Sequence, residues 1–219
     1  MKKNLLNRMT ILMVAIVNIG FVSCGDDGDD NGQNNKGTGY SPGEAIDLGL
    51  SVKWASCNVG AKKDSEVGDF YLWGETETKN YYYDDSYTLD AGTLPRNIAN
   101  TQYDVAHVKW GGKWRMPTET ELKELIACES RKATRDGREG YMFYGENGNT
   151  IFLPATGLAY KSEIRYDGEE GVYWSSINSS GSSSAFIPTL KFNLEHNESP
   201  RIYPILPTRG AVVRPVCEY

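Results

Sequence analysis

The stretch Trp110-Gly-Gly-Lys-Trp-Arg-Met-Pro-Thr118 runs directly into Glu119-Thr-Glu-Leu-Lys-Glu-Leu-Ile-Ala-Cys128 and carries the strongest fold signal in the chain. Thr118 and Glu121 have the spacing of a capping box, in which each side chain bonds a backbone donor at the start of a helix. The apolar residues that follow recur at the i, i+3 and i+4 spacing of a helix lying on a core: Leu122, Leu125 and Ile126. The stretch therefore predicts a buried corner that leads into a helix over residues 119–128.

Composition and charge limit the classes of protein to which the chain can belong. Of its 219 residues, 39% are hydrophobic and 24% are charged, as in ordinary globular proteins. The formal net charge is -6, whereas nucleic-acid binders present a basic patch. We therefore expect no nucleic-acid partner, and residues 44–219 are long enough to form one domain.

The first 43 residues have the features of an export signal and a tether. Basic residues precede an apolar run, Met9 to Phe21, which ends near Cys24, the three-part pattern of a secretory signal. Because this run resembles the lipobox of bacterial lipoproteins, we expect residues 1–23 to be a lipoprotein signal peptide and Cys24 to be lipidated. Residues 24–43 are rich in Asp, Gly and Asn and predict a flexible acidic tether.

The rest of the chain reads as many short strands, about two helices and long loops, an α+β pattern. Residues 141–144 and 150–154 predict a β-hairpin, because Asn147-Gly148 between apolar runs favours a tight primed turn. Residues 132–140 are charged and turn-like. The remaining expected elements are a strand or short hairpin over 45–57, strands over 68–74, 171–176, 185–194 and 212–217, and helical turns over 101–109.

A long loop over residues 75–95 contains the run Tyr81-Tyr82-Tyr83 followed by Asp84 and Asp85. Two interpretations are open. The tyrosines form a stacking platform for a sugar or nucleobase, or they belong to a surface loop and pack on the core.

Six motifs occur in order along residues 44–219: Asp47-Leu-Gly-Leu-Ser-Val-Lys-Trp-Ala55, Gly68-Asp-Phe-Tyr-Leu-Trp-Gly-Glu75, Trp110 to Thr118, Ile151-Phe-Leu-Pro-Ala155, Tyr173-Trp-Ser-Ser176 and Val213-Arg-Pro-Val216. With them the chain resembles the Fibrobacter succinogenes major paralogous domain family, found in surface lipoproteins of gut Bacteroidetes. The resemblance implies a C-type lectin-like fold with paired first and last strands. It also implies a lipid-anchored protein of the outer membrane, on the cell surface, whose later loops face the ligand.

The same fold branch includes the formylglycine-generating enzyme, which needs two closely spaced cysteines in the last quarter of its domain. That region of this chain contains only Cys217, and the sequence has no Gly-x-Ser-x-Gly or His-Glu-x-x-His motif. We therefore expect no catalytic residues, no cofactor and no metal. The leading hypothesis is a non-enzymatic module that binds an unknown glycan or protein. The alternatives are a structural or assembly subunit of the envelope or a fibre and, less favoured, an enzyme whose formylglycine-generating activity is lost or degenerate.

The cysteines of the domain suggest one disulfide in an oxidising compartment. A Cys128–Cys217 bond would parallel the long-range bridge of the lectin fold that the resemblance implies. A Cys57–Cys217 bond would suit paired terminal strands. Both pairings stay open at this point.

Two sets of residues are predicted to have roles. The region between residues 175 and 210 combines small polar residues with an apolar loop over 201–207, so we expect an exposed recognition patch there; the alternative is that these residues cover a sheet. The candidate ligand-binding residues are Asn178, Ser179, Ser182, Ile202, Tyr203, Ile205 and Leu206. The expected structural residues are Trp114, Arg115, Pro117, Thr118, Glu121, Trp174 and Arg214. Of these, Arg115 and Arg214 each need a carboxylate if buried, with Glu121 or Glu75 as candidates.

Overall fold

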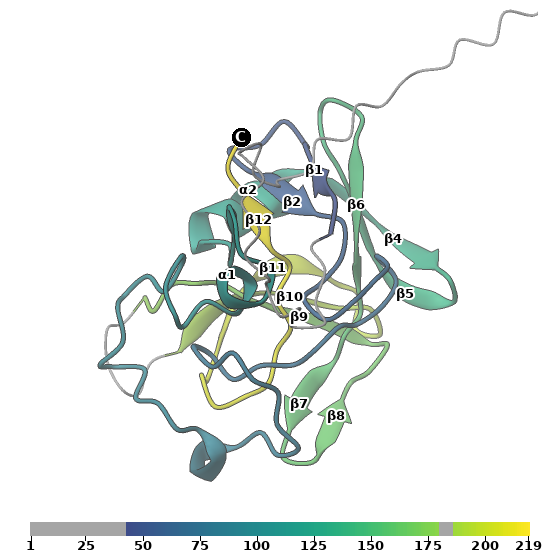
Figure 1. Ribbon diagram of the computed structural model, residues 1–219. Helices are drawn as coiled ribbons and strands as arrows, with labels where there is room; N and C mark the ends of the chain where they lie inside the picture. Colours follow the sequence, from purple (N-terminus) through teal and green to yellow (C-terminus); the bar gives the residue numbers. More distant parts are fainter. Residues whose placement is uncertain (1–42, 180–185) are drawn as a thin grey trace, which may run out of the picture.

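A computed structural model describes residues 43–179 and 186–219 (Figure 1). The predicted signal peptide, most of the tether, Cys24 and Ser182 lie outside these residues. Within them are the short 3-10 helix η1 (Asp84–Ser86), the helices α1 (Val105–Trp110) and α2 (Glu119–Ala127) and the following strands: β1 (Ala45–Ile46), β2 (Lys53–Ala55), β3 (Trp114–Arg115), β4 (Glu129–Arg135), β5 (Arg138–Tyr144), β6 (Thr150–Pro154), β7 (Leu158–Tyr160), β8 (Glu163–Arg165), β9 (Glu170–Trp174), β10 (Ile187–Asn193), β11 (Glu198–Ile205) and β12 (Val216–Cys217). No helix in the described part is long and apolar enough to cross a membrane.

The strands form small antiparallel sheets, so the predicted α+β class is confirmed at this level. The sheets have the orders β1-β2-β12-β3, β11-β10-β9, β4-β5-β6 and β7-β8. β12 pairs with β2 on one side and with β3 on the other. The N-terminal hairpin and the C-terminal strand therefore lie side by side, but the last strand pairs with β2 and not with the first strand, β1.

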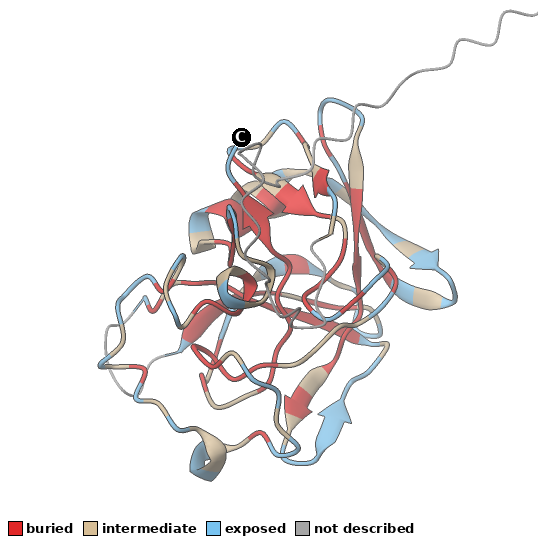
Figure 2. Ribbon diagram, viewed as in Figure 1, coloured by how far each residue is buried: buried red, intermediate tan, exposed pale blue. Residues whose placement is uncertain are grey.

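The core runs through the middle of the molecule, where the sheets and α2 meet (Figure 2). Leu122 and Leu125 of α2 belong to the same buried cluster as Leu190 and Phe192 of β10. Burying one such side chain contributes about 1.5–3 kcal/mol to stability. The amphipathic face predicted for this helix is thus the face that covers the β9–β11 sheet.

The corner before α2 is built as the sequence predicted. The Thr118 backbone N–H donates to Glu121 Oε2 at 2.7 Å, and the Glu121 N–H donates to Thr118 Oγ1 at 3.3 Å, which forms the capping box. The Arg115 guanidinium also donates to both Glu121 oxygens, at 2.9 and 2.6 Å. One buried carboxylate therefore caps the helix and neutralises the buried arginine, and Glu218 adds a second ion pair at 2.7 Å.

Arg214 does not have the carboxylate partner that the sequence led us to expect. Its Nε donates to Asn58 Oδ1 at 2.7 Å, and its two Nη atoms donate to the carbonyls of Ala55, Ser56 and Phe152 at 2.9–3.1 Å. The charge of the Arg214 guanidinium is thus stabilised by hydrogen bonds to neutral oxygens of β2, β6 and the turn after β2. Glu75, the other candidate partner, pairs with Lys79 at 2.6 Å.

Residues 132–140 are not a turn but most of a second β-hairpin, β4–β5. Its two-residue turn is Asp136-Gly137, and both residues have positive φ (47° and 81°), the signature of a primed turn. The predicted hairpin β5–β6 is present, but its connection spans residues 145–149, and only Gly148 there has positive φ. The tight primed turn expected at Asn147-Gly148 therefore lies at the other hairpin.

Other expected elements also differ from the structure. Residues 68–74 form a single bridge, Tyr71 to Ala211, and the last strand shrinks to Val216–Cys217. Residues 201–207 are largely strand β11. The Ser175 N–H donates to the Pro188 carbonyl, so residue 188 faces β9; its partner in β11, Pro204, therefore directs its backbone nitrogen to the free edge, where a proline is tolerated.

We predict that Arg115→Met destabilises the protein by about 3–5 kcal/mol, because the substitution leaves the Glu121 carboxylate buried without its partner. Chemical denaturation of the full-length protein measures this change. The double variant Arg115→Met/Glu121→Leu should recover much of the loss. Equal stability of wild type and Arg115→Met would contradict the role assigned to the pair.

The same pair predicts a dependence of stability on pH. Burial raises the pKa of Glu121, but hydrogen bonds from Arg115 and Thr118 outweigh it and hold that pKa below its usual range. The resulting stability is present above the unfolded-state pKa of about 4.3 and is lost as the pH falls through the lower folded pKa. Between about pH 5 and pH 3, Glu121→Gln should lose less stability than wild type; identical slopes would contradict this account.

Candidate functional site

The predicted ligand-binding residues do not form one exposed surface. Asn178 is buried, and its Nδ2 donates to the Ala91 carbonyl at 2.8 Å. Ile205 is buried and Ile202 packs on the core, because β11 is a strand with one face inward. Leu206 is half-buried, Ser182 lies outside the described residues, and only Ser179 and Tyr203 are exposed.

The predicted structural residues do occupy buried or capping positions. The Trp114 ring packs edge to face on Trp110 with centroids 5.2 Å apart, and Trp174 Nε1 donates to the Tyr71 carbonyl at 2.8 Å. The Pro117 carbonyl accepts from the Ser176 N–H at 2.8 Å. These contacts join the corner before α2 to the segment that follows β9.

Neither predicted disulfide is formed. Cys57 and Cys128 both carry free thiols, and burial raises the pKa of each. In the sheet, Cys217 lies opposite Lys53 on one side and Trp114 on the other. Cys217 is itself disulfide-bonded, but to neither of the two predicted partners.

The tyrosine run is divided between core and surface, so the packing interpretation holds for part of it, and the stacking platform stays a prediction. Tyr82 is buried, and its hydroxyl donates to the Phe70 carbonyl at 3.0 Å. Its backbone pairs with Lys161, with N–O distances of 2.9 and 2.8 Å. This pairing docks the loop on the β7–β8 hairpin and leaves Tyr81 exposed and Tyr83 half-buried beside it.

A third segment completes the same corner. Ala159 of β7 and Gly210 exchange backbone hydrogen bonds of 2.8 and 2.9 Å. A Cβ on Gly210 would lie 2.6 Å from both the Ala159 Cβ and the Tyr82 Cδ1. Only glycine allows the three segments to approach this closely. They meet at the end of the molecule that carries the β7–β8 hairpin, opposite β1, β2 and the C-terminus (Figure 1).

Aromatic rings and cations converge at this corner, which we call the Tyr160 cluster: Tyr83, Tyr160, Lys161, Arg165 and Arg209. The Tyr83 and Tyr160 rings pack edge to face with centroids 5.4 Å apart. The Arg165 guanidinium lies 4.0 Å from the Tyr160 centroid, the Arg209 guanidinium 4.8 Å and the Lys161 ammonium 5.7 Å. Such distances are those of cation–π contacts.

The positive charges of the cluster are only partly matched by carboxylates. Asp84 accepts from Arg209 at 3.1 Å, and hydrogen bonds from Thr208 and then Arg209 hold its pKa below the usual range. Arg165 lies 4.0 Å from Glu163. Within the described part of the chain, Lys161 has no carboxylate within ion-pair distance.

A hollow of about 410 Å³ adjoins the cluster and shares Lys161 with it. Its lining combines apolar surface from Phe70, Tyr82 and Ile164 with polar and charged side chains. The latter are Thr78, Asn80 and Ser162, the cations Lys79 and Lys161, and the carboxylates Asp69 and Glu163. Ligand sites commonly combine these two kinds of surface.

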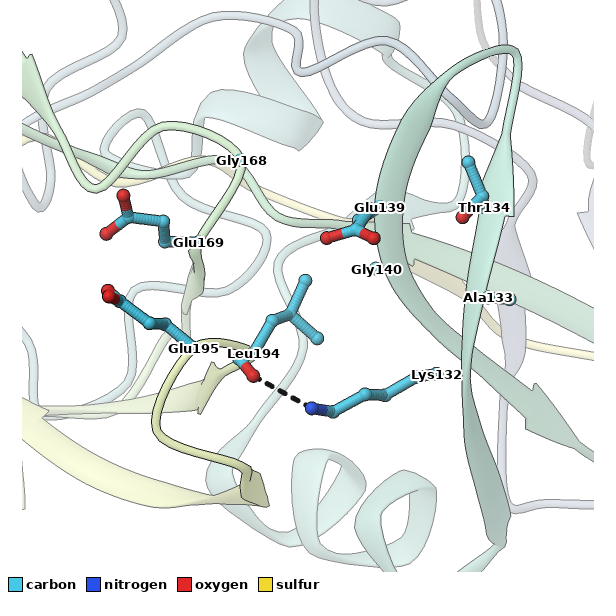
Figure 3. A pocket seen from close by; sticks show the side chains of 9 residues that line it. All are labelled: Lys132, Ala133, Thr134, Glu139, Gly140, Gly168, Glu169, Leu194 and Glu195. Carbon is cyan, nitrogen blue, oxygen red and sulfur yellow. Dashed lines mark hydrogen bonds between the residues drawn. The ribbon is translucent and has the colours of Figure 1, made fainter.

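A second hollow, of about 380 Å³, lies between the β4–β5 hairpin and the turns around Gly168 and Glu195 (Figure 3). Its titratable groups are mainly the carboxylates of Glu139, Glu169 and Glu195, and the Lys132 ammonium is already bound to the Leu194 carbonyl at 2.8 Å. Exposed carboxylates without further organisation do not define a site, so the Tyr160 cluster is the better candidate.

Tyr203 offers an internal comparison. Lys191 and Arg201 lie 5.0 and 5.2 Å from its ring, but each has a carboxylate close by: Glu170 at 3.0 Å and Glu198 at 2.7 Å. This Tyr203 group repeats the chemistry of the Tyr160 cluster with its charges paired.

Among residues 43–179 and 186–219, no three His, Cys, Asp or Glu side chains gather closely enough to hold a metal ion. No protein-family model, curated protein or solved structure matches the chain.

We predict that Gly210→Ala destabilises the protein by about 1–3 kcal/mol, because its Cβ forces the segments at the Tyr160 cluster apart. Denaturant unfolding measures the loss. Ser162→Ala in the exposed β7–β8 turn is the control and should change stability by less than about 0.5 kcal/mol. An unaltered Gly210→Ala protein would contradict the close packing of the three segments.

Proposed function

We propose that the protein is a non-enzymatic binding module held at the outer surface of the outer membrane by lipid on Cys24. Residues 24–43 form its tether, and residues 44–219 form a head with the C-type lectin-like fold of the Fibrobacter succinogenes major paralogous domain family. The head binds a glycan or protein ligand through the Tyr160 cluster. The observation that carries the proposal is the convergence of tyrosines and cations from three distant segments on one accessible corner.

The position of the cluster supports this function. The described chain begins beside β1, at the end of the molecule that also holds the C-terminus, and the β7–β8 hairpin lies at the opposite end (Figure 1). A tether attached at residue 43 would direct the hairpin end away from the membrane. The Tyr160 cluster would then face the surroundings of the cell.

The chemistry of the cluster also suits recognition. Tyrosine offers a large, rigid contact surface at a low cost in conformational entropy. Backbone pairing of Tyr82 with Lys161 and of Ala159 with Gly210 holds the segments before any ligand arrives. Preorganisation of this kind raises affinity, because less freedom is lost on binding.

The alternative, a structural or assembly subunit, would gain support from a free edge strand able to pair with another chain. β4 carries Glu129, Arg131, Lys132 and Arg135 along its length. In β11, Pro204 lacks an N–H and directs its backbone nitrogen to the open side of the strand. Charges and prolines at edges oppose strand addition, and this favours the binding module.

The degenerate-enzyme alternative requires thiolates. Burial raises the pKa of both Cys57 and Cys128, so these sulfurs stay protonated at neutral pH. Reactive and metal-binding cysteines have lowered pKa values instead. The environment of these two thiols therefore supports a role in packing.

A glycan array probed with the full-length protein tests the proposal, with binding to one class of glycans expected. Tyr160→Ala should weaken that binding at least about tenfold, or about 1.4 kcal/mol. Tyr203→Ala, at the comparison group, should leave it unchanged. Thermal melting separates loss of binding from loss of folding, and Lys161→Gly replaces Tyr160→Ala if the latter unfolds. Self-association without glycan binding would favour the assembly subunit.

A further inference from the structure

We propose that the ligand of the Tyr160 cluster is an anionic polysaccharide, recognised through the carboxylate or sulfate groups on its sugars. This inference rests on the proposed function, since it names the ligand class of the same site. It follows from the charge balance of the cluster, the orientation of its cations and the hollow beside it.

Three cations lie within 5.7 Å of one tyrosine ring. Arg209 bonds Asp84 and Arg165 lies 4.0 Å from Glu163, so among the described residues the charge of Lys161 is the one left without a carboxylate at ion-pair distance. Like charges this close repel one another unless an anion lies between or over them. The chain as a whole has a net charge of -6, so this corner is a local positive spot on an acidic protein. A bound anion would relieve the repulsion.

The tyrosine rings hold the cations in a form that suits oxyanions. Arg165 lies 4.0 Å from the Tyr160 centroid and Arg209 lies 5.1 Å from the Tyr83 centroid. A guanidinium group packed on a ring is restrained, and its planar fork of N–H donors matches carboxylate and sulfate oxygens. The cluster is therefore built to hold one or two such groups.

Lys161 has an unusual backbone conformation. Its φ is +56° at the first turn position of the β7–β8 hairpin, where glycine or asparagine is the usual residue. A lysine there is strained, and strain of this kind gathers at functional sites. The ammonium lies between the cluster and the hollow, so one cation can serve both.

The adjoining hollow accounts for the sugar itself. Phe70, Tyr82 and Ile164 offer apolar surface to the C–H face of a pyranose, and Asn80 and Ser162 offer hydrogen bonds to its hydroxyls. The carboxylates of Asp69 and Glu163 also line the hollow and can accept hydrogen bonds from sugar hydroxyls. A lipid headgroup or a nucleic-acid backbone would use the cations without needing this mixed surface. The observations therefore favour a charged saccharide over either of them.

The test measures binding of the full-length protein to polygalacturonate and to neutral dextran by isothermal titration calorimetry. We expect binding to polygalacturonate alone, weakening at least about tenfold between about 50 and 500 mM NaCl, because salt screens exposed charges. Lys161→Gly, Arg165→Gln and Arg209→Gln should each weaken it about fivefold or more. Lys161→Gly should fold normally, because glycine adopts positive φ without strain. Lys191→Gln and Arg201→Gln, at the Tyr203 group, are the matched controls and should bind as wild type does.

Other outcomes would overturn the inference. Equal binding to dextran, unaffected by Lys161→Gly, would leave the binding module standing and remove the anionic ligand. Equal losses in the Lys191→Gln and Lys161→Gly variants would reduce the effect to general charge attraction. Tighter binding to vesicles containing phosphatidylglycerol, or to DNA, would replace the saccharide with another anion. Absence of binding to every glycan on the array and to both polymers would remove the proposed function itself.

Discussion

The buried guanidinium of Arg214 is the constraint on which the rest of the structure depends. A charge in the core must be fully hydrogen-bonded, and the partners of Arg214 come from the end of β2, from Asn58 and from β6. Its neighbours along the chain extend the same role. The carbonyls of Val212, Val213 and Pro215 accept from Trp174, Val59 and Ala55. Residues 210–217 thus form a buried segment, called the spine below, that bonds β2, the turn after β2, β6 and β9.

This spine also explains how the candidate site is held. Its first residue, Gly210, pairs with Ala159, and the residue before it is Arg209 of the Tyr160 cluster. Arg209 is therefore attached directly to the most buried segment of the protein, while Tyr83 and Lys161 are fixed to the same corner through the Tyr82–Lys161 pairing. A site supported in this way is rigid before ligand arrives, as selective recognition requires. The cluster lies at the opposite end of the molecule from residue 43, where the described chain begins (Figure 1), so in the proposed arrangement anchoring and recognition occupy opposite ends.

Features set by neighbouring residues could be predicted from the sequence, and features set by distant contacts could not. The capping box of α2 and the β5–β6 hairpin follow from residues a few positions apart. The Asp136-Gly137 turn lies within residues predicted to be turn-like, but the strands on either side of it were missed because many of their residues are charged. β11 was mistaken for a loop because its two prolines are acceptable only on an edge, which the sheet order alone reveals. The Tyr160 cluster joins residues 83, 160 and 209, and of these only the tyrosine run gave a signal in the sequence.

The central claim is that recognition takes place at the Tyr160 cluster and not in the region between residues 178 and 206. Amide hydrogen exchange of the full-length protein, with and without saturating polygalacturonate, tests it most directly, because bound ligand slows local opening. The account predicts added protection in residues 81–84, 158–166 and 206–210. Protection confined to residues 178–179 and 198–205, or to the hollow around residues 132–140 and 194–195, would contradict it.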